Sequence, residues 1–156
     1  MTDHYLFIDS RFSDSTSNVD FDVIFNKATQ THTGGYPTQV FKNVTSVELT
    51  AFSMNAYPTT SDENYVVLDI DELNNRMHSN VPEVNQCYAI VYIDDPVSQK
   101  NYKGHDFDTK IVFFDPPLSS LSRLTIKIKN PLTRDLIEDR GKSTFIFKII
   151  TQTSNA

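Results

Sequence analysis

Apolar and polar residues alternate with a period of two along several stretches of the chain. The clearest stretch is 123–130, in which Leu124, Ile126 and Ile128 are separated by threonine and lysine. Because successive side chains of a strand point to opposite faces of a sheet, this alternation predicts a half-buried strand with the three apolar residues facing the core. The stretch 18–26 alternates in the same way and predicts another half-buried strand.

A third alternating stretch, 46–54, places Val47, Leu49 and Ala51 on one face of a predicted strand. Other runs have β-branched and aromatic residues on both faces, which favours strands that are central in a sheet or that face a neighbouring subunit. These runs are 64–70, 87–93, 110–114 and 143–150. The short run 5–9 predicts one further strand.

Turn residues separate these runs, and helical patterns are rare. Only 71–77 and 132–142 have the spacing of short helices. Many short strands with almost no helix predict an all-β, antiparallel β-sandwich. The lack of tryptophan and of paired cysteines disfavours an immunoglobulin domain, and long connections at 27–43 and 71–86 suit a jelly roll. We therefore expect a single jelly roll of about eight strands.

The length of 156 residues suits one domain. We expect residues 1–156 to form a single jelly-roll domain with short flexible tails at 1–4 and 152–156. The net charge of −6 and the lack of any lysine or arginine run disfavour a nucleic-acid partner. The longest apolar run is far shorter than the ~20 residues of a membrane-spanning helix, so no membrane span is expected. The N-terminus lacks the pattern of a signal peptide, and a single cysteine, Cys87, favours a reducing compartment.

Two groups of residues resemble reactive or iron-binding sites. Cys87 has no histidine near it in sequence that could activate it, so a buried packing cysteine is expected. The stretch HDFD, residues 105–108, begins like an iron site, but no histidine follows His105 to complete the ligand set. An exposed loop that runs into a strand is therefore expected at 105–108.

A third group is acidic. The stretch LDIDE, residues 68–72, together with Asp94 and Asp95, offers the oxygen ligands that calcium prefers, but it lacks the spacing of a calcium loop. A solvated acidic edge that includes Asp69 and Asp71 on one strand face is the favoured interpretation. We predict no catalytic, cofactor-binding or metal-binding residues in the chain, and no cofactor.

Two adjacent prolines interrupt the apolar run that begins at Lys110. Because Pro116 and Pro117 cannot donate backbone hydrogen bonds, the preceding strand is expected to end near Asp115. Arg123 opens the next strand and could pair with Asp115 across the turn. On physical grounds alone, this stretch is a rigid connection that sets strand register.

The same stretch carries a family resemblance. FDPPLSSLSRLTIKIKNP, which ends at Pro131, resembles a segment of the small jelly-roll capsid proteins of large icosahedral double-stranded DNA viruses of the nucleocytoplasmic group. FKNVTSVELTAFSMNA, YVVLDIDEL and YAIVYID are similar to strands of the same proteins, so the resemblance spans roughly residues 40–131. The polar loop YPTTSDEN departs from the family pattern.

The resemblance implies a structural virion protein without enzymatic activity. The expected role is a pentameric vertex capsomer, or penton, which contacts copies of itself and neighbouring major and minor capsid proteins in a capsid assembled in the host cytoplasm. The length fits a single jelly roll, whereas the major capsid proteins of such viruses resemble two fused ones. The two-sided runs 87–93 and 143–150 would suit contacts between copies, because a closed ring needs two different complementary surfaces.

Three other functions remain open on the sequence. A minor capsid protein could cement larger capsomers with the same fold. A carbohydrate-binding jelly roll for host attachment could stack sugar rings on Tyr57, Tyr65 or Tyr102. A metal oxygenase built around His105 is disfavoured by the order of the histidines.

Overall fold

Nine β-strands make up almost all the regular structure of the residues that the structure describes. The computed structural model describes residues 1–13, 15–25, 40–54, 65–74, 77–92, 100–103, 110–130 and 141–153. The strands are β1 (Thr2–Asp9), β2 (Asp20–Ile24), β3 (Phe41–Met54), β4 (Tyr65–Ile70), β5 (Ala89–Tyr92), β6 (Lys100–Lys103), β7 (Lys110–Leu121), β8 (Arg123–Lys129) and β9 (Ser143–Thr151). Two single-turn 3-10 helices, η1 (Ser10–Phe12) and η2 (Asp71–Leu73), follow β1 and β4.

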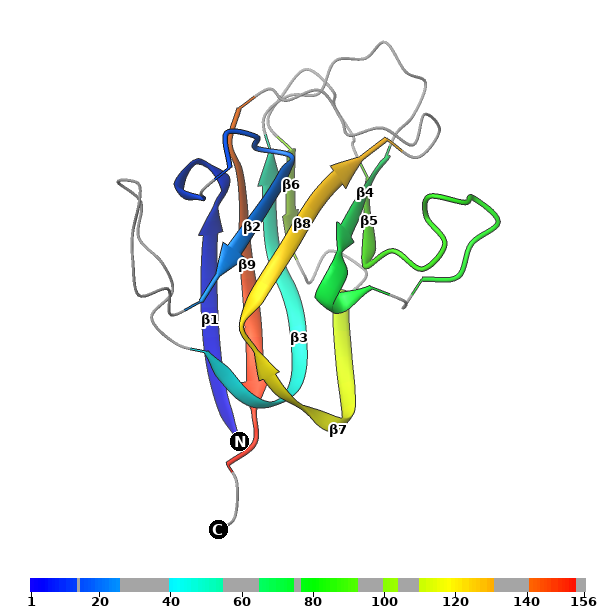
Figure 1. The fold of residues 1–156 in the computed structure, drawn as a ribbon. Coiled ribbons are helices and arrows are strands. Elements are labelled where there is room, and N and C mark those ends of the chain that lie inside the picture. The colour runs from blue at the N-terminus through cyan, green and yellow to red at the C-terminus, as the bar shows by residue number, and fades with distance from the viewer. Residues whose placement is uncertain are drawn as a thin grey trace.

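The strands form two antiparallel sheets that pack face to face. In sheet A the order is β1-β9-β3, and β3 pairs on its other side with β7 along its first part and with β6 along its last part. In sheet B the order is β2-β8-β4-β5. Figure 1 shows β2 and β8 crossing in front of β1, β9 and β3. The expected all-β, antiparallel sandwich is confirmed.

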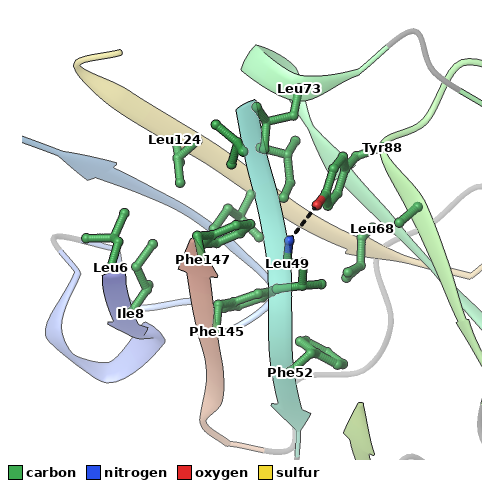
Figure 2. Packing of buried hydrophobic residues seen from close by; sticks show 14 of the residues in the cluster. Leu6, Ile8, Leu49, Phe52, Leu68, Leu73, Tyr88, Leu124, Phe145 and Phe147 are labelled. Atoms are coloured by element: carbon green, nitrogen blue, oxygen red, sulfur yellow. Dashed lines mark hydrogen bonds between the residues drawn. The ribbon is translucent and has the colours of Figure 1, made fainter. Parts of the chain in front are cut away.

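The core lies between the sheets and consists of the residues that alternate inward. Leu124, Ile126 and Ile128 of β8 are fully buried, as their period of two predicts. Phe145 and Phe147 of β9 lie opposite them in sheet A and are also fully buried (Figure 2). Burial of each such side chain contributes roughly 1.5–3 kcal/mol relative to exposure, so these alternating strands supply most of the driving force for the two-layer fold.

The prediction that Ala51 shares a face with Val47 and Leu49 is wrong, and a bulge in β3 explains why. Leu49 pairs with Phe147 and Ala51 with Ile146, so Thr50 is an extra residue in β3. An extra residue reverses the faces of all side chains that follow it. Ala51 is therefore only half-buried, and Phe52 takes the place in the core.

The predicted end of a strand at Asp115 is also wrong. β7 continues through Pro116 and Pro117 to Leu121, and the Asp115–Pro116 peptide is cis. Leu118 pairs with Val44 and Phe113 with Ser46, so residues 114–117 bulge out opposite a single residue of β3. Among the described strands β7 pairs only with β3, and such an edge position tolerates prolines because one side needs no donors.

Other expectations at the ends of elements also change. Arg123 pairs with Asp22 of β2 at 2.9 Å between Nη2 and Oδ2, rather than with Asp115. Residues 2–4 belong to β1 and are not a flexible tail. The predicted helix at 71–77 is reduced to η2 in its described part, and 131–140 lies outside the described residues. At the C-terminus, the Gln152 N–H donates to the Asn43 carbonyl at 2.8 Å.

Tyr88 connects the two sheets by hydrogen bonds at the point where β3 changes its partner. Its hydroxyl accepts from the Leu49 N–H of β3 at 3.1 Å and donates to the Lys110 carbonyl of β7 at 2.5 Å. The side chain is buried, and Figure 2 shows it reaching from the side of β4 and β5 to β3. Buried backbone groups without partners are costly, so this hydroxyl compensates for the interruption between β6 and β7.

The two hydrogen bonds of the Tyr88 hydroxyl predict that removing this hydroxyl lowers the stability of the fold. Tyr88→Phe keeps the ring but leaves the Leu49 N–H and the Lys110 carbonyl without their hydroxyl partner. We expect the free energy of unfolding to fall by about 1–3 kcal/mol, measured by urea denaturation.

The matched control is Tyr5→Phe, because Tyr5 lies in β1 with its ring exposed. Its effect should stay within about 0.5 kcal/mol, as for most surface changes. Both variants are compared with the parent chain at one protein concentration, because association would shift the apparent stability. Equal stability of Tyr88→Phe and the parent chain would show that the hydroxyl is not needed at this junction.

Candidate interaction surface

Large apolar side chains are exposed on the outer face of sheet A. Tyr5 and Phe7 alternate with core residues along β1 and are 67% and 63% exposed. Phe113 follows the buried Val112 of β7 and is 68% exposed. Ile146 and Ile150 of β9 are half-buried between these aromatic residues.

The strand register places these residues on one surface. Phe7 lies opposite Ile146, which in turn lies opposite Ala51. Ser46 lies opposite both Ile150 and Phe113 and is itself buried, although it belongs to the outer face. Cross-strand neighbours share a face of the sheet. We define the A face as Tyr5, Phe7, Ile111, Phe113, Ile146 and Ile150.

A row of charged residues crosses the middle of the A face. Lys148 lies opposite Tyr5 on one side and Glu48 on the other. Its Nζ lies 3.3 Å from Asp3 Oδ2, and the hydrogen bond to Asp3 raises the pKa of the Lys148 ammonium. Lys148 and Asp3 are therefore paired within the sheet, Glu48 lies beside them, and the apolar residues flank this row.

The outer face of sheet B, by contrast, is polar along β2 and β8. Lys127 lies opposite Asp20 of β2 and Asp69 of β4. Thr125 donates from its N–H to Glu72 Oε1 and from its hydroxyl to Glu72 Oε2, at 2.5 and 3.1 Å. This part of sheet B therefore has the polar, solvent-facing side that is common in antiparallel sheets.

Residues 77–88, here called the covering segment, pack on sheet B beside β4 and β5. Val84 and Cys87 form a second apolar cluster with Val67 of β4, separate from the core between the sheets. Cys87 is 3% exposed, and burial raises the pKa of its thiol to about 11. Its position agrees with the expected packing role, because a reactive cysteine needs a low pKa and access to solvent.

The predicted acidic edge at Asp69 is not an edge. β4 lies between β8 and β5, and the Asp69 carboxylate pairs with Lys129 at 2.8 Å between Oδ2 and Nζ. The Asn74 amide also donates to Asp69, and Lys129 lies 4.0 Å from Glu83 of the covering segment. Asp69 is therefore a half-buried structural ion pair, and Asp71 is separated from it in η2.

Most of the other candidate groups lie outside the described residues. The stretches 105–108 and 94–95 and Tyr57 lie outside the described residues, and the side chain of Tyr102 is not described. Tyr65 is half-buried beside the second apolar cluster, so its expected exposure for sugar stacking is wrong. Within the described part of the chain, no group of three or more His, Cys, Asp or Glu residues is placed to hold a metal ion. No helix in that part is long and apolar enough to span a bilayer.

The pattern of apolar residues along the chain does not predict the A face. Run 5–9 is apolar at both odd and even positions, which is compatible with a central strand or an exposed apolar face. The deciding fact is that β1 pairs only with β9 among the described strands, and that its odd positions point outward. This pairing between the two ends of the chain cannot be read from a local pattern.

The ion pair of Asp69 predicts a pH-dependent contribution to stability. Burial opposes ionisation of Asp69, but hydrogen bonds from Lys129 and Asn74 outweigh it and hold the pKa of the carboxyl below its ordinary value. A lowered pKa in the folded state stabilises the fold at pH above the unfolded pKa of ~3.9, and this contribution is lost as pH falls through the folded pKa. Lys129→Met should therefore lower the free energy of unfolding by about 1–2 kcal/mol near neutral pH, because it leaves a half-buried carboxylate unpaired.

The measurement is urea denaturation of the parent chain and Lys129→Met at about pH 7 and about pH 3, above and below the ordinary carboxyl pKa of ~3.9. The difference in stability should narrow at the lower pH, because protonation of Asp69 removes the charge that pairs with Lys129. Lys42→Met is the control, because Lys42 is exposed at the start of β3. A difference for Lys129→Met that is equal at both pH values would mean that the lysine acts through packing alone.

Comparison with known proteins adds no relative. The chain matches no protein-family model, and no curated protein sequence matches it significantly.

Proposed function

We propose that the chain is a structural virion protein, the pentameric vertex capsomer of a large icosahedral double-stranded DNA virus. In this role it catalyses no reaction. Copies of the chain associate with one another and with neighbouring major and minor capsid proteins. Assembly in the host cytoplasm, before the protein becomes part of the virion capsid, is part of the same proposal.

The order of strands supports a jelly roll, the fold that this role requires. Antiparallel pairs form between β1 and β9, β2 and β8, β3 and β7, and β4 and β5. The first strand pairs with the last and the second strand with the second-to-last. This inward order of pairs is that of one long hairpin rolled into two sheets. β6 and β7 occupy successive parts of the same edge of β3, so the nine strands fill eight positions, the number in a jelly roll.

The A face is the single observation that carries the proposal of assembly. Three aromatic side chains on one sheet face, each more than 60% exposed, are unusual for a protein that acts alone. Aromatic residues are enriched in the buried centres of protein–protein interfaces. A continuous sheet face presents these residues as a flat surface, which suits contact with another folded domain.

A minor capsid protein that cements larger capsomers is the second candidate. The A face would then contact a different protein instead of another copy of the chain. The oligomeric state of the pure protein separates the two roles, because only the vertex capsomer closes a ring with itself.

The test is the mass of the pure protein in solution, by sedimentation equilibrium and native mass spectrometry. The proposed role predicts a complex of about five times 17.8 kDa. Each copy carries a net charge of −6, so the pentamer fraction should increase as salt screens the repulsion between copies.

Two results would contradict the vertex role. A chain that stays monomeric at high concentration and at physiological salt cannot close a ring by itself. A monomer that binds glycans in a glycan-array screen would instead favour a carbohydrate-binding function.

A further inference from the structure

A second apolar surface lies on the opposite side of the sandwich. Tyr65 of β4 lies opposite Tyr92 of β5, and their ring centroids are 6.1 Å apart. Val67 lies opposite Ile90, so these residues share the outer face of sheet B. Tyr92 is 51% exposed, whereas Val67 is covered by the second apolar cluster.

The covering segment extends this surface. Met77 and Val81 are half-buried against the second apolar cluster, as are Tyr65 and Ile90. We define the β5 surface as Tyr65, Met77, Val81, Ile90 and Tyr92. It lies beyond the polar rows of β2 and β8, at the other edge of sheet B.

We propose that the A face of one copy binds the β5 surface of the next copy, and that this contact closes the ring. This inference rests on the proposed function. A cyclic ring needs two different surfaces on each subunit, whereas a surface that pairs with itself closes a two-fold dimer. The A face and the β5 surface lie on the outer sides of different sheets, so one subunit can bind a neighbour on each side.

The size of the A face favours a folded domain as its occupant. Four strands with the spacing and rise of a β-sheet present a face of roughly 500 Å². A stable interface covers about 800 Å² on each partner, so this face can supply the larger part of one. A peptide or a glycan would cover only a fraction of it.

The charges of both surfaces are compatible with burial between copies. Lys148 in the middle of the A face already pairs with Asp3. Beside the β5 surface, Lys129 pairs with Asp69 and lies near Glu83. Contact between copies therefore buries charges that have partners, which avoids the large cost of an unpaired buried charge.

The experiment compares three substitutions to glutamate at exposed aromatic positions. Phe7→Glu changes the A face, Tyr92→Glu changes the β5 surface, and Phe12→Glu is the matched control at a side chain in η1 that is 53% exposed and belongs to neither surface. Each of the first two should weaken self-association at least tenfold in sedimentation equilibrium. Phe12→Glu should assemble like the parent chain.

Mixing the two variants tests the pairing itself. In the mixture, the intact β5 surface of Phe7→Glu can bind the intact A face of Tyr92→Glu. One-to-one dimers should therefore form although neither variant associates alone, and no ring should close. Urea denaturation of each variant checks that the fold is retained.

A cross-linking measurement keeps the test valid if a glutamate variant does not fold. Phe7→Cys and Tyr92→Cys chains are mixed and treated with a short bis-maleimide. The native Cys87 should not react, because it is buried and its pKa is raised to about 11. Cross-links should join the two different variants and should be rare within either variant alone.

The outcomes separate this inference from the proposed function. If Tyr92→Glu forms the parent oligomer and Phe7→Glu does not, A faces bind each other and the proposed pairing is wrong, while self-assembly stands. If both glutamate variants form pentamers, the ring uses other surfaces and the pairing is again wrong. If the parent chain is monomeric, the proposed function is wrong, and so is the proposed pairing of the A face with the β5 surface.

Discussion

The interruption in the edge of sheet A is the constraint on which the rest of the sandwich depends. β3 pairs with β7 up to Leu49 and with β6 from Ala51 onward, so the backbone groups near Leu49 lose a continuous partner strand inside the core. The Tyr88 hydroxyl fills this place, and Tyr88 itself lies at the end of the covering segment, next to β5. One side chain thereby ties sheet A to the side of the molecule that carries the β5 surface.

The two outer faces differ because their strands have different neighbours. On sheet B, the polar positions of β8 meet acidic residues of β2, β4 and η2, so Arg123, Thr125 and Lys129 all have partners. On sheet A, the outward Phe7 of β1 lies opposite Ile146, and the outward Phe113 of β7 lies opposite Ser46. Among the described residues between them, only the row of Lys148 and Glu48 is charged. The first arrangement is stable in water as it stands, whereas the second leaves aromatic area exposed, as an interaction surface does.

Local pattern predicted the strands well and failed where distant parts of the chain meet. The burial of Leu124, Ile126 and Ile128 follows from their period of two, which no other contact disturbs. Ala51 was misplaced because the bulge at Thr50 arises from pairing with β9, about a hundred residues away. The ion pair of Asp69 could not be predicted because its partner, Lys129, lies on another strand, and no residue close to Asp69 in the sequence indicates that pairing. The A face could not be predicted for the same reason, since no local pattern shows that β1 lies at the edge of sheet A among the described strands.

Exposed aromatic surface on a protein of net charge −6 can associate selectively. Like charge keeps copies apart in random orientations, so an orientation is favoured only where apolar area is covered and each buried charge has a partner. The charged row of Lys148, Glu48 and Asp3 divides the A face, and a neighbour that slides along the strands would move its apolar residues onto this row. Apolar burial then supplies the affinity, while the internal ion pair restricts the register. Because the same sandwich holds the A face and the β5 surface on different sheets, the packing of the core would set the angle between successive copies in the proposed ring.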